Sequence, residues 1–109
     1  MSSTGSSLKM DLSETGLLMF FKPWQLECMK TLWSNNEGLS SREVWLAVEN
    51  EISRASVINF IEAMTVEGLL DKHEITGKGG HRGIYKPVYS ESKTREYLKR
   101  LFNQRLDEL

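Results

Sequence analysis

Glycines and basic residues gather in one stretch of the chain, LLDKHEITGKGGHRGIYKPVY, which covers residues 69–89. Four of the eight glycines lie within residues 77–83. A nucleotide-binding P-loop needs Gly-x-x-x-x-Gly-Lys followed by Ser or Thr, placed between a strand and a helix. Here Gly79 follows Lys78 and a strand-like run comes next, so that pattern fails. The dinucleotide pattern Gly-x-Gly-x-x-Gly also fails, because Arg82 stands at its third glycine position. The stretch is therefore typical of the tip of a β-hairpin.

The other residues that carry chemistry do not assemble into a catalytic or metal site. Cys28 falls among the apolar positions of an expected helix, which favours a buried structural thiol over a reactive one. The histidines, His73 and His81, and this single cysteine lack the spacing of a zinc site. No serine stands in a nucleophile motif with a patterned base. We therefore expect a protein that is not an enzyme and that binds no metal or cofactor. One cysteine also fits a reducing, cytoplasmic setting.

The composition is that of one small globular domain. The chain has 109 residues, of which 39% are hydrophobic and 27% charged, with a net charge of −1. The longest apolar run, GLLMFF at residues 16–21, is far shorter than the roughly 18 residues of a membrane-spanning helix. Residues 1–16 lack the order of a secretory signal and are expected to form a flexible tail. The charge is segregated: residues 37–70 are acidic, whereas residues 71–90 are basic and favour an anionic partner.

Two helices are expected in the first half of the chain. The first, KPWQLECMKTLW, covers residues 22–33, and Pro23 suits its first helical position because proline lacks the N–H that would be unpaired there. The second, LSSREVWLAVEN, covers residues 39–50. Its cap is expected at Ser40, with Glu43 three residues later as in a capping box.

A third helix and two strands follow. The helix ISRASVINFIEAMTVEG covers residues 52–68, with Ser53 as its cap and Gly68 at the left-handed position that ends helices. The strand-like runs LLDKHEI, at residues 69–75, and IYKPVY, at residues 84–89, flank the glycines and predict a β-hairpin.

The order of elements indicates a fold. The last run, SESKTREYLKRLFNQRLDEL, predicts a helix capped by Ser90 or Ser92. Three helices, a hairpin and a further helix describe a mostly helical α+β protein, a winged helix-turn-helix. Residues 38–40 are expected to add a short strand to the hairpin. We assign residues 17–90 to the winged-helix domain and residues 91–109 to a C-terminal dimerisation helix.

Several runs resemble a known family. LECMKTLWS, LSSREVWLAV, SVINFIEAMTVEGLLDK and YKPVYS are similar to the winged-helix domain of the penicillinase-repressor family of transcriptional regulators, over residues 22–90. The chain departs from that family in a longer, glycine-rich loop between the strands and in a smaller C-terminal helical region. The resemblance implies a winged-helix fold that binds DNA, and it favours repression over activation.

Two groups of residues are expected to contact DNA. The third helix would enter the major groove, where an Asn side chain can pair with adenine and an Ile side chain can touch a thymine methyl group. The hairpin at residues 69–89, here named the wing, would lie on flanking phosphates or in a neighbouring minor groove. The alternatives are plain solvation for the wing and, for the Ile, a place in the core or in a protein interface. The predicted contact residues are Arg54, Ser56, Ile58, Asn59, Lys72, Lys78, His81 and Arg82.

Assembly is predicted from the last helix. Its apolar residues spread over a wide arc, and the GLLMFF segment adds further apolar surface, which favours a homodimer. The alternative is that this face packs on its own domain. The residues expected at the dimer interface are Leu98, Leu101, Phe102, Leu106 and Leu109.

These observations predict a DNA-binding transcriptional regulator that represses by occupying an operator in double-stranded DNA. We expect a homodimer with no membrane partner and no evident small-molecule ligand. The alternative is a winged-helix module that binds another protein through the region around Ile58 and the acidic helices.

Overall fold

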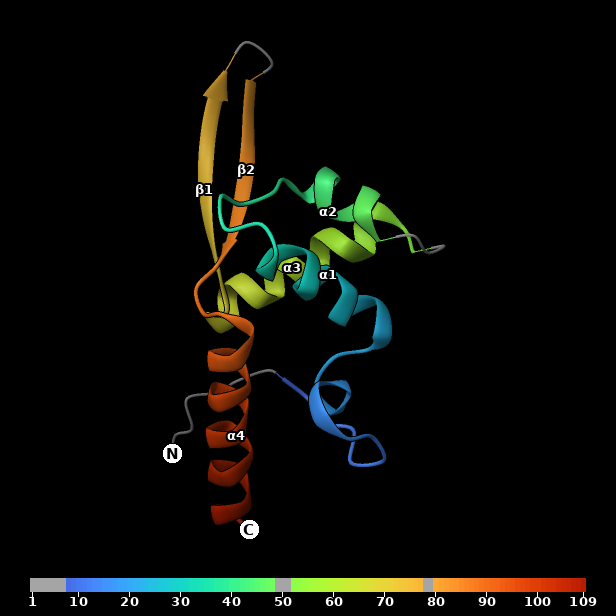
Figure 1. Ribbon diagram of the computed structural model, residues 1–109, viewed down its shortest axis with the longest axis vertical. Helices are drawn as coiled ribbons and strands as arrows, with labels where there is room; N and C mark the ends of the chain where they lie inside the picture. Colours follow the sequence, from blue (N-terminus) through green and yellow to red (C-terminus); the bar gives the residue numbers. More distant parts are fainter. Residues whose placement is uncertain (1–7, 49–51, 78–79) are drawn as a thin grey trace.

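The computed structural model describes residues 8–48, 52–77 and 80–109 (Figure 1). Its elements follow one another as the 3-10 helix η1 (Gly16–Met19), α1 (Pro23–Trp33), α2 (Ser41–Ala47), α3 (Arg54–Glu67), β1 (Leu70–Gly77), β2 (Gly80–Pro87) and α4 (Glu91–Asp107). The two strands form an antiparallel hairpin. The predicted mostly helical α+β fold is confirmed, in the predicted order of three helices, hairpin and further helix.

Helix ends lie close to where the capping residues place them. The Ser40 hydroxyl accepts a hydrogen bond from the Glu43 amide, and the Glu43 carboxylate accepts one from the Ser40 amide, which completes the predicted capping box. Ser53 caps α3 in the same way, through the amide of Ser56. Gly68 ends α3 at a φ of 95°, in the left-handed region that glycine adopts without a Cβ clash.

The hairpin differs from its prediction in length. Its strands pair from Leu70 with Pro87 to Gly77 with Gly80, so the glycines extend the strands and only residues 78–79 connect them. The expectation of a long glycine-rich loop was therefore wrong. The physical reason is that ladder pairing uses only backbone groups, so glycine can continue a strand that side-chain patterns do not reveal.

A third segment joins the hairpin, as predicted for residues 38–40. The Leu39 amide donates to the Tyr85 carbonyl at 3.0 Å, and the Tyr85 amide donates to the Leu39 carbonyl at 2.8 Å. Gly38, at a φ of 94°, allows the close approach, because an added Cβ would lie 2.6 Å from a methyl carbon of Ile84. This bridge attaches the base of the wing to the helical body.

The hydrophobic core extends to the N-terminal side of α1. Leu17 and Phe21, from the GLLMFF segment, are buried, and so is Leu8, which lies within the segment predicted as a tail. The Leu8 carbonyl also accepts a hydrogen bond from Arg105 of α4. Part of the apolar surface of the GLLMFF segment, which was expected to favour a dimer, is therefore buried within the chain itself.

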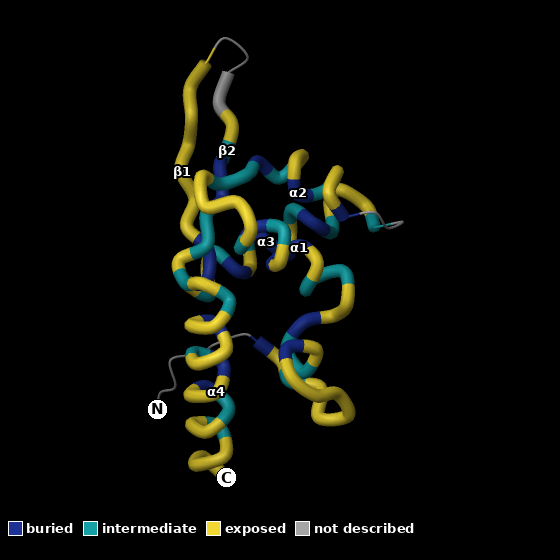
Figure 2. Tube along the Cα trace, viewed as in Figure 1, coloured by how far each residue is buried: buried dark blue, intermediate teal, exposed yellow. Residues whose placement is uncertain are grey.

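The hairpin and α4 project from the helical body in opposite directions (Figure 1). The molecule measures 52 × 30 × 23 Å along its principal axes. Most of β1 beyond Leu70 is exposed, whereas α4 is buried on one side and exposed on the other (Figure 2). The fold therefore presents two separate surfaces, one formed by α3 and the wing and one along α4.

Candidate nucleic-acid interface

Helix α3 divides cleanly into a buried face and an exposed face. Val57, Phe60, Ile61 and Met64 face the core. Of the residues predicted to contact DNA, Arg54 and Asn59 are exposed, whereas Ser56 and Ile58 are half-buried. The Ser53 hydroxyl donates to the Ser56 hydroxyl at 3.0 Å, so Ser56 takes part in the cap of the helix. Arg54 and Asn59 are therefore the members of this group with accessible polar side chains.

The residues predicted in the wing have different surroundings. Arg82 is exposed on β2. Lys72 is engaged within the molecule: its ammonium group lies 2.8 Å from a carboxylate oxygen of Glu62 and 5.5 Å from the centre of the Tyr85 ring. Lys78 and the side chain of His81 lie outside the described residues. Arg82 and Lys72 are thus both exposed, and Lys72 is in addition paired with Glu62 of α3.

Glu62 joins α3 to both strands of the wing. The same carboxylate oxygen that meets Lys72 also accepts a hydrogen bond from the Tyr85 hydroxyl. The hydrogen bond from Lys72, followed by that from Tyr85, lowers the pKa of Glu62. Burial, followed by the contact with Glu62, raises the pKa of Tyr85. The three groups form a polar cluster whose negative charge is balanced where α3 meets the hairpin.

Sequence patterns did not predict this role of Glu62. One signal was present in the sequence. No cation stands three or four residues from Glu62 on α3. An ion pair with Glu62 would therefore involve a residue of another element. Gly83 makes room for that partner, because a Cβ there would lie 2.7 Å from the Lys72 side chain.

A second tyrosine binds the last residue of α3. The Tyr97 hydroxyl of α4 donates to the Glu67 carboxylate at 2.9 Å, and the Tyr97 ring stacks on Tyr89 with 5.9 Å between ring centres. Burial, followed by the contact with Glu67, raises the pKa of Tyr97 to about 12. Both α3 carboxylates, at Glu62 and Glu67, are thus bound by tyrosine hydroxyls from other elements.

On the wing side, Arg82 lies near α2. The carboxylate of Glu43 has its pKa lowered, first by the hydrogen bonds at Ser40 and then, as the smallest cause, by the charge of Arg82. The charge of Arg82 therefore acts weakly at the start of α2, where Glu43 completes the capping box.

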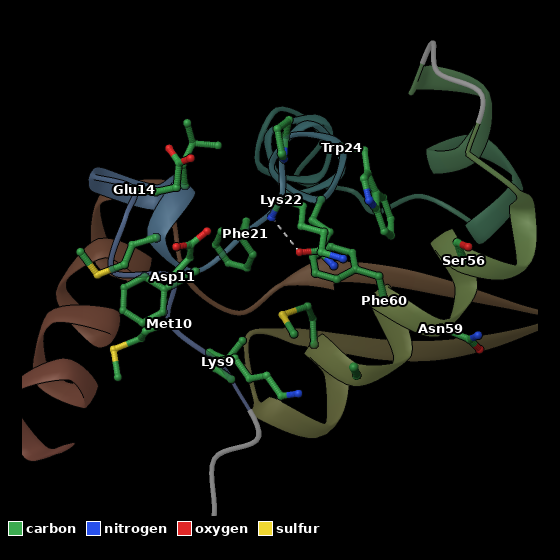
Figure 3. Close-up of a pocket in the computed structure, with 18 residues that line it drawn as sticks. Lys9, Met10, Asp11, Glu14, Phe21, Lys22, Trp24, Ser56, Asn59 and Phe60 are labelled. Carbon is green, nitrogen blue, oxygen red and sulfur yellow. Dashed lines mark hydrogen bonds between the residues drawn. The ribbon is translucent and has the colours of Figure 1, made fainter.

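A cavity of about 710 Å³ lies between the N-terminal segment, α1 and α3 (Figure 3). Phe21, Trp24 and Phe60 contribute aromatic side chains to it, and Ser56 and Asn59 lie at its edge. In Figure 3 the Asn59 side chain points away from the rings of Phe21 and Phe60. The Asn59 amide therefore faces outward from α3.

The residues predicted at a dimer interface divide into two groups. Leu98 and Leu101 are buried within the chain, at 2% and 9% exposure. These two leucines therefore pack on their own domain, which was the alternative to a dimer contact. Phe102 is half-buried, and Leu106 and Leu109 are exposed. Of the residues predicted at the interface, those that keep exposed apolar surface therefore lie in the last turns of α4, beside a groove against η1 that Phe102 lines.

Residues 8–48, 52–77 and 80–109 also bear on metal binding and on membrane insertion. These residues contain no group of three or more His, Cys, Asp or Glu side chains placed to hold a metal ion. None of their helices has the length and apolar content needed to cross a membrane. Cys28 is fully buried, and that burial raises the pKa of its thiol to about 12, in keeping with the predicted structural role.

Comparison with known proteins identifies a shared fold. No protein-family model and no curated protein matches the chain. Among solved structures, the fold is similar to that of a possible transcriptional regulator from Methanosarcina mazei Go1, with a TM-score of 0.66 and 16% sequence identity. The match covers 81% of this chain and 72% of that protein. At this level of identity the similarity establishes the arrangement of helices and hairpin.

Proposed function

We propose that this chain is a winged helix-turn-helix transcriptional regulator that binds double-stranded DNA, with α3 in the major groove and the hairpin on the flanking backbone. The similar fold of a possible transcriptional regulator supports a regulatory role. The resemblance of residues 22–90 to the penicillinase-repressor family favours repression, in which an occupied operator blocks access of polymerase.

One observation carries the proposal: Glu62, a carboxylate on α3, is paired with Lys72 and Tyr85. A free carboxylate on a reading helix would repel the duplex, whereas a paired one adds little net charge. The exposed Arg54 and Arg82 then supply cations at the start of α3 and on the wing.

Binding of DNA as a dimer is the finer part of the proposal. Leu106 and Leu109 expose apolar side chains near the end of α4, beside the half-buried Phe102. Burial of a leucine contributes roughly 1.5–3 kcal/mol, so a few such side chains shared across a two-fold axis would support association. Such a dimer would favour a palindromic site with half-sites about 34–36 Å apart. Sedimentation at tens of micromolar tests this step, and a monomer there would contradict it.

The test of DNA binding is a salt titration on random duplex DNA, read by fluorescence anisotropy. Affinity should fall steeply with salt, because each phosphate contact releases counterions. The variant Lys78→Ala with Arg82→Ala should lower the slope of log affinity against log salt by about two. The matched double variant Lys93→Ala with Arg100→Ala removes two cations from α4 and should leave the slope unchanged. Salt-independent or undetectable binding by the unmodified chain would reject the proposed function in favour of a protein-binding module.

A further inference from the structure

The outward face of α3 is poor in charge and rich in apolar side chains. Ala55, Asn59, Ala63 and Val66 are exposed, and Val66 is 87% exposed. Their spacing of four, four and three residues places them in one row along the helix, opposite the buried row. The Asn59 amide thus lies between apolar side chains, at the centre of the surface that would face the base pairs in the major groove.

The charged residues of α3 do not contribute to this row. Glu62 lies on the same side, but one of its oxygens accepts from both Lys72 and Tyr85. Arg54 is at the first position of the helix, about 100° around the axis from Ala55. Within this row the Asn59 amide is therefore the group able to donate and accept hydrogen bonds at a base edge.

This combination corresponds to one kind of base pair. In the major groove, an Asn side chain pairs bidentately with N6 and N7 of adenine, and apolar side chains contact the C5-methyl group of thymine. Guanine is read chiefly by Arg or Lys, and cytosine by a carboxylate. The exposed row has neither an Arg nor a Lys, and the nearest carboxylate is held by two partners.

Resting on the proposed function, we infer that α3 selects an A·T-rich core site, with adenine opposite Asn59 and thymine methyl groups against the neighbouring apolar side chains. Four residues advance a helix by about 6 Å, which is about two base-pair steps of about 3.4 Å each. The preferred thymines are therefore expected about two base pairs to either side of the adenine that contacts Asn59, facing Ala55 and Ala63.

The first experiment is selection of a preferred site from a random-duplex library by the full chain. Recovered sites should carry A·T pairs where α3 contacts the duplex, which in the proposed dimer is within each half-site. Recovery of sites with G·C pairs at the positions of strongest preference, or of no preferred site by a chain that binds duplex DNA, would overturn the inference.

The second experiment removes single methyl groups from the selected duplex by replacing thymine with uracil at each position in turn. Loss of a contacted methyl group should weaken binding about threefold to fivefold, in line with the transfer free energy of one carbon group. Replacement of thymines outside the selected core is the matched control and should change nothing. Equal affinity for all thymine and uracil duplexes would overturn the methyl contacts.

The third experiment tests the amide. Asn59→Ala should reduce the preference for adenine at one position by about tenfold, the discrimination typical of a bidentate pair. Asn103→Ala, which removes an exposed amide from α4, should leave that preference intact. An unchanged preference in Asn59→Ala would overturn the assignment of adenine to this residue.

These outcomes are separable from failure of the proposed function. If the chain shows no salt-dependent binding to any duplex, the DNA-binding proposal fails and the inference fails with it. If salt-dependent binding is present and the A·T preference is absent, only the inference fails. The salt titration is therefore done first.

Discussion

Helix α3 and helix α4 are held in place by different kinds of interaction. At the wing, Glu62 binds Lys72 and Tyr85 through hydrogen bonds and opposite charge. Along α4, Leu98 and Leu101 are buried in one hydrophobic core together with Leu8 and Leu17 from the N-terminal segment. The wing contact is polar and partly exposed, whereas the α4 contact is mainly apolar and enclosed.

The difference indicates what each contact contributes. Hydrogen bonds are directional, so the Glu62 cluster restricts the angle between α3 and the hairpin, on which simultaneous contact with DNA would depend. Exposed ion pairs contribute little stability. Apolar burial is non-directional and contributes most of the favourable free energy of folding. We therefore expect substitutions along α4 to act on stability and substitutions at the wing to act on orientation.

The largest effect is expected at Leu98. Leu98→Ala should lower the free energy of unfolding by about 2–5 kcal/mol, because it removes buried methyl groups and leaves a cavity. Urea unfolding followed by circular dichroism measures the change. Leu106→Ala is the matched control, since Leu106 is 47% exposed and its truncation should cost much less. Equal losses in the two variants would contradict the division of α4 into a buried and an exposed side.

A smaller effect is expected at Tyr85. Tyr85→Phe keeps the buried ring and removes the hydroxyl that donates to Glu62. The loss should be about 1–2 kcal/mol, towards the lower end because the Glu62 side chain is 42% exposed and water can replace the donor. Tyr89→Phe removes a hydroxyl from the half-buried ring beside α4 and is the control. If Tyr85→Phe were as stable as the unmodified chain, the polar cluster would have no role in holding the wing.

Duplex affinity gives Tyr85→Phe a second measurement. If the cluster restricts the angle of the wing, the variant should bind DNA more weakly than its stability alone explains, at temperatures where it is fully folded. Unchanged affinity would leave the cluster with a stabilising role only.

The sequence predicted the parts of the fold that depend on local chemistry. Ser40, Ser53 and Gly68 end or begin helices through contacts with residues a few positions away, so their roles can be inferred from spacing. The fold class followed from the order of these elements. The glycines at residues 77–83 were harder to interpret, because backbone pairing between strands leaves no side-chain pattern.

The candidate site was predicted less completely, because it depends on contacts between distant residues. The pairing of Lys72 with Glu62 joins residues ten positions apart on different elements, and that of Tyr85 with Glu62 joins residues twenty-three apart. A repeating pattern of residue types along the sequence does not indicate such a pair. The burial of Leu8 likewise depends on the tertiary packing that encloses the core, although the residue lies in a Ser- and Gly-rich segment.

The smallest expected effect is a change in how stability depends on pH, and it isolates the charge of Glu62. The hydrogen bond from Lys72, followed by that from Tyr85, holds the pKa of this carboxyl below its usual range in the folded chain. A lowered folded-state pKa contributes stability above the unfolded pKa of about 4.3, and that stability is lost as the pH falls through the folded value. Glu62→Gln keeps an acceptor for Tyr85 and removes the charge. It should therefore be less stable than the unmodified chain at pH 6, by at most about 1 kcal/mol because the pair is partly exposed, and the difference should be smaller at pH 3. Urea midpoints at the two pH values measure this, with Glu96→Gln on the exposed side of α4 as the control that should match the unmodified chain at both. A difference of the same size at pH 6 and at pH 3 would show that Glu62 acts through its shape and hydrogen bonds, and that the wing is held without help from its charge.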